Sequence, residues 1–225
     1  MPNLDTKKQV AEFYEDFQSR GKYDYFYGDE KRKNLYIQLI GKSNKILEVG
    51  CRSGNLTQFY HEGNEVVGID VDRNALIEFE KRLSLKSHWV DVDSEDLPFD
   101  SGSFDIVVFS EVMEHLRFPQ KALAEISRVL RKDGRLIGSV PNAFRLRNRW
   151  KFICGQPFET DPSHLRSYSV ATLRMELEKC FDSVDIHPVS GHLVGGGSTG
   201  VPVYSWLPYN IRTLFALDLV FWGMK

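Results

Sequence analysis

The sequence predicts an α/β fold, a doubly wound and mostly parallel sheet preceded by an N-terminal helical cap. Over residues 45–140, short apolar runs alternate with amphipathic segments, which is the pattern of strands connected by helices. The chain has 225 residues, a length that ordinarily forms one domain. Crossover connections between successive parallel strands produce a doubly wound sheet.

Short apolar runs mark the expected strands. They are Lys45–Val49, Glu65–Asp70, His88–Asp91, Phe104–Ser110 and Arg135–Val140, with another at Val184–Pro188. Helices are expected at Arg73–Leu83, Pro119–Arg131 and Val170–Cys180. The second helix is the clearest, because its apolar residues recur at helical spacing, Pro119 suits a first turn and residues 132–134 supply a stop.

The two ends of the chain have less pattern. Residues 1–40 are rich in aromatic and polar side chains and are expected to form the helical cap. No convincing last strand follows Val184–Pro188, so either Gly200–Trp206 serves as one or that strand is absent. The amphipathic segment Ile211–Trp222 is expected to dock on the core, with a lid or a dimer contact as alternatives. The run GGGSTG at 195–200 reads as a flexible linkage.

Composition excludes several classes of protein. Hydrophobic residues make up 42% of the chain and charged residues 27%, which is enough apolar material for a continuous core. The 29 basic and 31 acidic side chains give a charge of -2, which disfavours a protein that holds nucleic acid by bulk attraction. Three distant cysteines, no signal peptide and no run of about 20 apolar residues predict a cytoplasmic protein without a membrane span.

Candidate ligand-binding residues follow the strands, because open parallel sheets bind ligands at the carboxyl ends of their strands. The small-residue turn at 50–54 follows the first strand and lets backbone approach a ligand. Asp70 ends the second strand, twenty residues past Gly50, where a carboxylate can accept hydrogen bonds from ribose hydroxyls. Asp93 and Ser94 follow the third strand and could read the edge of an adenine.

The glycine pattern separates two ligand classes. A dinucleotide fingerprint that begins at Gly50 would need glycine at positions 52 and 55, but these hold Arg52 and Asn55. Their side chains would crowd a pyrophosphate, so a ligand with one nucleoside and no phosphate fits better. A nicotinamide-linked oxidoreductase is therefore the less favoured alternative.

Five stretches carry a resemblance to a known family. In order they are ILEVGCRSGNLTQF, VVGIDVD, DSEDLPFDSGSFDIVVFSEVMEHL, ALAEISRVLRKDGRLIGSVPN and HLRSYSVATLRMELEKC. Over residues 35–185 the chain resembles the small-molecule class I S-adenosylmethionine-dependent methyltransferases and is similar to their ubiquinone-biosynthesis O-methyltransferase group. The resemblance implies a Rossmann-like methyltransferase fold, S-adenosylmethionine as cofactor and S-adenosylhomocysteine as product.

The resemblance also implies residue roles. Around the methionyl part of the cofactor would lie Glu48, Gly50, Cys51 and Gly54. Asp70 would hold the ribose hydroxyls, Val71 would pack on the adenine, and Asp93 and Ser94 would read its edge. Ser110 would lie beside the sulfonium. Arg52 departs from the family, which usually has glycine at this position.

Two histidines, His115 and His164, are the candidate catalytic residues. Methyl transfer is an in-line displacement, so the protein has to align the acceptor, exclude water and remove a proton from an oxygen or carbon acceptor. His164 follows the irregular insert that should form part of the substrate wall. A purely structural role is the alternative for each histidine.

Glu111, Glu114 and His115 have the spacing of residues that neighbour one another on a helix. The segment resembles the metal-binding segment of two O-methyltransferase groups, in one of which a later histidine completes the site, as His164 could here. Two carboxylates and imidazole nitrogens suit a divalent ion. The same Glu-His pair occurs in family members without a metal, so a divalent metal is left open and is not expected.

A basic run lies around Trp150, just after the fifth strand. Its members are Arg145, Arg147, Arg149 and Lys151. They predict either the solvated face of a helix or an anchor for an anionic acceptor. The run is too narrow for a nucleic-acid footprint.

These observations predict one methyltransferase domain over residues 1–225. It would comprise the cap (1–40), the cofactor-binding core (41–140), the substrate-wall insert (141–168) and the C-terminal part (169–225). The acceptor is expected to be a small molecule or a sugar- or lipid-linked precursor, methylated at oxygen rather than nitrogen or carbon. Nucleic acid is not expected as a partner, and a homodimer is left open. A cofactor-binding scaffold without turnover is the non-enzyme alternative.

Overall fold

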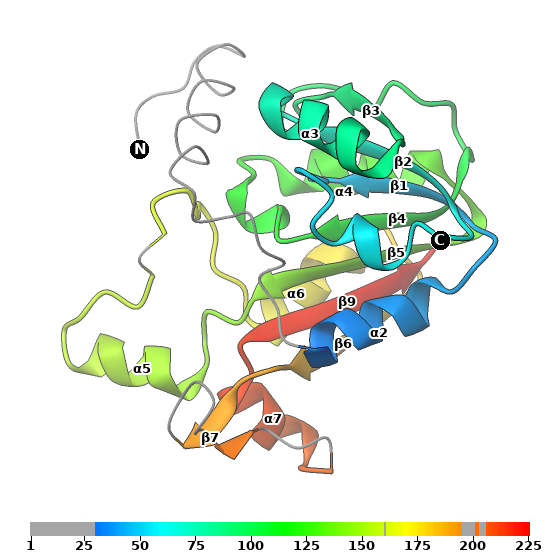
Figure 1. Cartoon of the computed structure of the whole chain (residues 1–225). Helices are drawn as coiled ribbons and strands as arrows, with labels where there is room; N and C mark the ends of the chain where they lie inside the picture. The colour runs from blue at the N-terminus through cyan, green and yellow to red at the C-terminus, as the bar shows by residue number, and fades with distance from the viewer. Residues whose placement is uncertain (1–29, 160, 195–200, 203–205) are drawn as a thin grey trace.

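A seven-stranded sheet in the order β3-β2-β1-β4-β5-β9-β6 runs through the centre of the protein (Figure 1). It is seen in a computed structural model that describes residues 30–159, 161–194, 201–202 and 206–225. The strands are β1 Lys45–Val49, β2 Glu65–Asp70, β3 Lys86–Trp89, β4 Phe104–Ser110, β5 Leu130–Pro141, β6 Ser183–Val189 and β9 Asp218–Met224. β1 to β5 pair in parallel, and β9 pairs antiparallel with β5 and β6. The predicted doubly wound, mostly parallel sheet is confirmed.

Helices cover both faces of this sheet. They are α2 Glu30–Ile40, α3 Arg73–Leu83, α4 Pro119–Val129, α5 Leu146–Ile153, α6 Val170–Leu177 and α7 Tyr209–Phe215, with single 3₁₀ turns η1 Thr57–Phe59 and η2 Met113–His115. Local sequence explains where two of them begin. The Asp72 side chain caps α3 by accepting from two backbone N–H groups, and Ser169 with Thr172 forms a capping box at α6.

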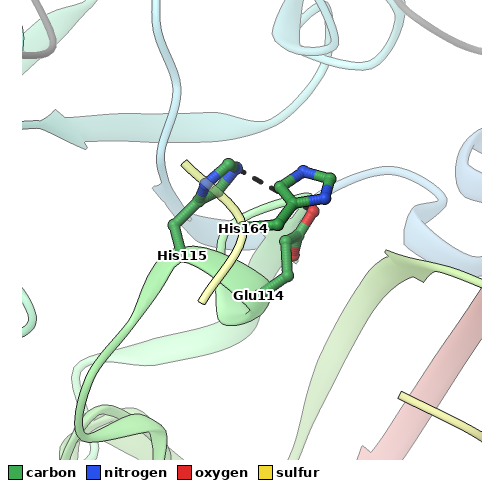
Figure 2. Close-up of side chains that lie close together, drawn as sticks. All are labelled: Glu114, His115 and His164. Atoms are coloured by element: carbon green, nitrogen blue, oxygen red, sulfur yellow. Dashed lines mark ion pairs between the residues drawn. The ribbon is translucent and has the colours of Figure 1, made fainter. Parts of the chain in front are cut away.

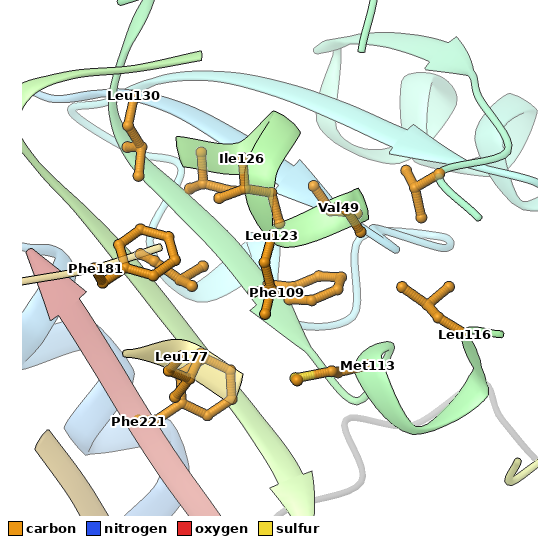
Figure 3. Close-up of a cluster of buried hydrophobic side chains, with 14 of the residues drawn as sticks. Val49, Phe109, Met113, Leu116, Leu123, Ile126, Leu130, Leu177, Phe181 and Phe221 are labelled. Carbon is orange, nitrogen blue, oxygen red and sulfur yellow. The ribbon is translucent and has the colours of Figure 1, made fainter. Parts of the chain in front are cut away.

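Two hydrophobic clusters pack on opposite faces of the sheet because strand side chains alternate. In β4, Val107 and Phe109 belong to one cluster, whereas Ile106 and Val108 belong to the other. The first cluster includes the buried stripes of α4 and α6, with Leu123 and Leu177 beside Phe109 and Phe221 (Figure 3). The second includes Tyr36 and Ile40 of α2. The central strands are thus buried on both sides. This packing holds the strands in place, so their carboxyl ends lie at one fixed edge of the sheet.

The end of the chain differs from the prediction. The segment Ile211–Trp222 was expected to be one amphipathic element, but it divides into α7 and the strand β9, which lies between β5 and β6. Leu219, Val220 and Phe221 are all fully buried. A strand that is covered on both faces shows a continuous apolar run and not an alternating one, so its pattern resembles that of a buried helix. The described part of Gly200–Trp206 does not join this sheet, since β8 Val201–Pro202 pairs with β7 His192–Val194.

The other boundaries shift by a few residues. β3 begins and ends two residues earlier than predicted, α4 ends at Val129, and β5 extends back to Leu130. Of the predicted helical cap, only α2 lies within the described residues, and the GGGSTG run lies outside them. None of the described helices combines the length and apolar character needed to cross a membrane.

Candidate functional site

The carboxyl ends of β1 to β4 lie at one edge of the sheet because these strands are parallel. The residues predicted to bind a ligand follow these ends: the turn at 50–54 after β1, Asp70 at the end of β2, Asp93 after β3 and Ser110 at the end of β4. The sheet therefore brings together side chains that are up to sixty residues apart in the sequence.

The turn at 50–54 has a backbone that favours glycine. Gly50, Arg52 and Gly54 have φ angles of +77°, +47° and +82°. A Cβ atom on Gly50 would lie 2.3 Å from Cγ2 of Val112, and one on Gly54 would lie 2.4 Å from Cδ1 of Leu83. The positive φ angles favour glycine at these two positions, and a larger residue would also displace the side chains of Val112 and Leu83. Arg52 adopts the left-handed conformation at a cost of about 1–2 kcal/mol, which explains why glycine is usual there.

Asp70 is held in one orientation by the backbone around it. Its Oδ2 accepts a hydrogen bond from the N–H of Arg52 at 2.9 Å, and its Oδ1 accepts one from the N–H of Asp72 at 2.9 Å. Burial raises the pKa of Asp70, and these two hydrogen bonds oppose that rise. A carboxylate has about four lone-pair positions, so Asp70 can still accept two hydrogen bonds from a diol.

Glu48 is buried beneath the turn, with 3% of its surface exposed. Its Oε2 accepts hydrogen bonds from Thr57 and, at 2.5 Å, from the Tyr60 hydroxyl. Burial raises the pKa of Glu48 to about 7, although both hydroxyl hydrogen bonds lower it. Neither Thr57 nor Tyr60 was predicted. The sequence does contain an indication of this contact, because two residues with hydroxyl side chains follow the glycine turn and Glu48 lies on a strand expected to be buried.

The residues predicted to contact adenine have partners of their own. Oδ2 of Asp93 accepts from Nε of Arg117 at 2.8 Å, and Oδ1 accepts from the N–H of Phe118 at 2.8 Å. The Ser94 hydroxyl donates to Asp91 at 2.6 Å. These contacts fix the loop that follows β3. The sequence reasoning did not predict Arg117.

Three other predicted residues line the strand ends. The Val71 carbonyl accepts from Nε1 of Trp89 at 2.7 Å. Cys51 is 2% exposed, and burial raises its thiol pKa well above the ordinary value, so the thiol stays protonated and packs as a small apolar group. The Ser110 hydroxyl lies 3.0 Å from that of Ser139 on β5.

Glu111 does not share a helix face with His115, so this part of the prediction was wrong. Glu111 has a φ of +55° and lies before η2, a single turn. Its carboxylate accepts from the Ser139 hydroxyl at 2.5 Å and pairs with Arg32 at 3.1 Å. The helical spacing was misleading because the chain leaves β4 through a left-handed residue.

Glu114, His115 and His164 do come together (Figure 2). One ligand atom from each lies within 4.8 Å of the others, and the two imidazole ring centroids are 4.9 Å apart. The contact has a backbone cause, since the N–H groups of Leu165 and Arg166 donate to the Glu114 carbonyl at 2.9 and 3.1 Å. These bonds hold the loop that carries His164 against η2. The predicted juxtaposition of the two histidines is thus present.

The cluster has unusual electrostatics. Glu114 is 2% exposed, and among the described residues neither of its carboxylate oxygens has a hydrogen-bond partner. Burial, followed by the nearby charge of Glu111, raises the pKa of Glu114 well above its ordinary value. Burial and then His164 lower the pKa of His115. Oε1 of Glu114 lies 4.0 Å from Nε2 of His115. Buried carboxyls without hydrogen-bond partners are rare in proteins and often mark a functional site.

Hydrogen bonds define the chemistry available at the two imidazoles. Nδ1 of His115 lies 3.1 Å from the Ser163 carbonyl, which can only accept, so Nδ1 carries the proton and Nε2 the lone pair. Nδ1 of His164 lies 3.0 Å from the Glu159 carboxylate, which favours the same tautomer. Each Nε2 can therefore take a proton or bind a cation.

Comparison with known proteins identifies the core. Residues 47–138 match the family model described as "Methyltransferase domain". Residues 47–138 carry a methyltransferase domain. The methyltransferase domain was predicted from five stretches within residues 35–185, four of which overlap the matched segment, and the prediction of this domain is confirmed.

Two relatives and one structure illustrate the similarity of the methyltransferase domain. Human thiol S-methyltransferase TMT1B is 31% identical over 150 residues, which cover 61% of this chain and 60% of that protein. Malonyl-[acyl-carrier protein] O-methyltransferase of Enterobacter lignolyticus is 29% identical over 120 residues, which cover 50% and 46%. A crystal structure of a SAM-dependent methyltransferase from Thermotoga maritima superposes with a TM-score of 0.67 at 15% identity, covering 96% of this chain and 99% of that one. The chain thus spans about half the length of these curated relatives, and the structural match supports the fold.

Proposed function

We propose that this protein transfers the methyl group of S-adenosylmethionine to an oxygen of a small-molecule or sugar- or lipid-linked acceptor in the cytoplasm. One observation carries the proposal. Asp70 ends β2 and Asp93 follows β3 at the same edge where η2, one turn beyond β4, carries His115 against His164. Methyl transfer to a hydroxyl requires a site for the nucleoside cofactor and a base that removes the acceptor proton, and this edge offers candidate residues for both.

The cofactor half would be built from residues of β1, β2 and the loops after β3 and β4. In this proposal Asp70 accepts from the ribose hydroxyls, and Asp93 with Ser94 meets the adenine edge beside Val71. The turn at Gly50, Cys51 and Gly54 contacts the methionyl part, supported from below by Glu48, and Ser110 lies nearest the sulfonium. The cofactor supplies an electrophilic methyl group, so the protein contributes binding, alignment and proton removal.

The acceptor half would lie between η2 and residues 141–168, in a single domain formed by the whole chain. Nε2 of His115 or His164 would take the acceptor proton as the oxygen attacks. Oxygen is favoured over sulfur because a hydroxyl needs a base at neutral pH, whereas a thiol ionises with a pKa of about 8.5. Among the relatives, one is named as a thiol S-methyltransferase and another as an O-methyltransferase of malonyl-[acyl-carrier protein].

Product formation tests the proposal directly. Release of S-adenosylhomocysteine is measured with a panel of phenols, sugars and lipid-linked alcohols, and at least one should give turnover that His115→Asn lowers. Cofactor binding without turnover on any acceptor would favour the non-catalytic scaffold. A melting temperature raised by NAD and not by S-adenosylhomocysteine would favour the oxidoreductase and overturn the proposal.

A divalent cation is a second candidate for the Glu114–His115–His164 cluster. The buried Glu114 carboxylate, whose oxygens have no hydrogen-bond partner among the described residues, favours it, since one carboxylate and two imidazoles form a suitable ligand set. A bound cation would polarise an acceptor hydroxyl. Calorimetric titration with manganese or magnesium should then give heat that Glu114→Gln abolishes and Glu111→Gln leaves. Absence of heat, together with activity that a chelator does not reduce, would exclude the cation and leave the imidazole base.

A further inference from the structure

Helix α5 exposes large apolar side chains that the proposed reaction does not use. Trp150 is 66% exposed, Phe152 70% and Ile153 73%. Leu146 and, just before the helix, Phe144 are also exposed, at 45% and 42%. An exposed helix of eight residues with four apolar side chains in water is unusual, and such patches mark interaction sites.

Three of these side chains form a stripe along the outer side of α5. Leu146, Trp150 and Ile153 are related by steps of four and three residues, so they lie above one another on the helix. Asn148, on the opposite side, is buried and donates to the Ala143 carbonyl. At 100° per residue, Arg147 falls on one flank of the stripe and Arg149 on the other. The outer surface of α5 is therefore an apolar centre between two guanidinium groups.

The charge around this stripe is strongly positive. Residues 142–158 contain four basic side chains and no acidic one, although the whole chain has a charge of -2. Within the part of the chain that the structure describes, Arg147 and Lys151 form no ion pair. Arg149 donates from Nε to the Phe144 carbonyl at 2.7 Å, a neutral acceptor that leaves its charge uncompensated. The positive charge of these residues can thus meet an anionic surface.

A second exposed aromatic group lies at the same end of the molecule. α5 contacts α7, and Trp206, just before α7, is 75% exposed (Figure 1). Tyr209 and Ile211 of α7 are 41% and 36% exposed. Tryptophan and tyrosine beside basic residues are typical of segments that lie in the interface of a bilayer.

We infer that α5 docks this protein onto an anionic lipid bilayer, with Leu146, Trp150 and Ile153 inserted at the headgroup level and Arg147 and Arg149 against lipid phosphates. A second copy of the chain fits this surface poorly. In a two-fold dimer the same patch faces itself, so the guanidinium groups of both copies would meet. An anionic bilayer complements both the apolar centre and its basic flanks.

Docking would place the bilayer beside the proposed acceptor site. The chain leaves α5 at Ile153 and reaches Glu159, the partner of His164, six residues later. A lipid-linked acceptor in that bilayer would thus reach the imidazole pair from the side of residues 141–168. This consequence rests on the proposed function, whereas the docking itself does not require catalysis.

Vesicle sedimentation of the full chain tests the inference. The probes are vesicles of phosphatidylcholine alone and of phosphatidylcholine mixed equally with phosphatidylglycerol. We expect binding to the mixed vesicles only, weakened by added salt. Arg147→Gln with Arg149→Gln should weaken it about thirtyfold, and Trp150→Ser with Ile153→Ser at least about tenfold. The matched control is Ile77→Ser on α3, since Ile77 is also 66% exposed and lies away from α5.

Several results would overturn the inference. The inference is wrong if the protein binds both kinds of vesicle equally or binds neither. It is also wrong if Ile77→Ser reduces vesicle binding as much as the α5 variants do. Self-association in sedimentation velocity that Trp150→Ser with Ile153→Ser abolishes would assign the stripe to a second copy instead. The two arginines would instead bind a free anion if the protein did not bind vesicles and if Arg147→Gln with Arg149→Gln lowered the turnover of a water-soluble anionic acceptor. Melting temperature and S-adenosylhomocysteine affinity are measured for the same variants and should not change. Loss of vesicle binding with both values unchanged would then concern docking alone, and not the methyltransferase proposal.

Discussion

The guanidinium of Arg32 lies 3.1 Å from the carboxylate of Glu111 and joins helix α2 to the residue that follows β4. The same Nη1 atom lies 3.2 Å from Asp218 at the start of β9. Burial alone would lower the pKa of Arg32, but the two carboxylates outweigh it and raise the pKa. One buried cation thus holds three distant parts of the chain at the edge where the candidate site lies.

Replacement of Arg32 by methionine should destabilise the fold strongly. Arg32 is 2% exposed, so its loss leaves two carboxylates near one another without their cation. Removal of one partner from a buried ion pair costs about 3–5 kcal/mol. Urea denaturation measures the change in the free energy of unfolding. The control is Lys33→Met, which removes an ion pair to the exposed Glu30 and should cost less than about 1 kcal/mol. Equal effects of the two substitutions would contradict the role of Arg32.

Glu48 should make stability depend on pH. Its pKa is raised from 4.5 to about 7 in the folded protein, so between these pH values the folded state keeps a proton that the unfolded state has released. The free energy of unfolding should therefore fall as pH rises through this window, by up to about 3 kcal/mol. Glu48→Gln does not ionise and should remove this part of the decline. Denaturation at about pH 5 and pH 8 measures it, with the exposed Glu65→Gln as control. A decline that persists in Glu48→Gln would assign the dependence to another group.

Asp70→Asn should weaken cofactor binding. An amide places an N–H2 against the N–H of either Arg52 or Asp72 and removes one acceptor for a ribose hydroxyl. We expect a loss of about 1–3 kcal/mol in S-adenosylhomocysteine affinity by calorimetry. Asp72→Asn is the matched control, because asparagine also caps helices and can keep the bonds to the N–H groups of Asn74 and Ala75. A similar loss in both variants would mean that the effect is one of local folding.

Loss of His115 should reduce turnover and leave cofactor affinity nearly unchanged. A general base contributes about 10²–10⁴-fold, so His115→Gln should lose activity in that range. Because the pKa of His115 is lowered from 6.5, the unprotonated base persists to lower pH. The midpoint of the acidic limb of the pH–rate profile should therefore lie below pH 6.5. The exposed His88→Gln should keep both rate and profile. If His115→Gln abolishes S-adenosylhomocysteine binding, the role of His115 is structural.

Residue patterns that depend on near neighbours were predictable. β1, β2, β4 and α3 have the predicted boundaries, because each is a short apolar or amphipathic run that ends at a turn or a capping residue. Asp70 and Asp93 were placed at strand ends because the parallel topology follows from the alternation of strands and helices. The proximity of His115 and His164 was also predicted, although its cause, backbone bonds to the Glu114 carbonyl, was not.

Other features depended on contacts between distant segments. β9 was missed because Leu219, Val220 and Phe221 gain their strand conformation only by insertion between β5 and β6. Glu111 was placed on a helix because its spacing allowed it, whereas a left-handed backbone and the pairing with Arg32 direct it elsewhere. Thr57 and Tyr60 were not predicted either, because their role as hydrogen-bond donors to Glu48 depends on the burial of Glu48 beside them.

The sequence by itself determined the parallel sheet, its glycine turn and the acidic residues at its edge, since periodicity and turn chemistry are local properties of the chain. Tertiary structure decided which charges are buried together, which strand closes the sheet and which apolar side chains remain in solvent. The physical reason is that burial and electrostatic pairing depend on distances across the fold, and no spacing along the chain fixes those distances.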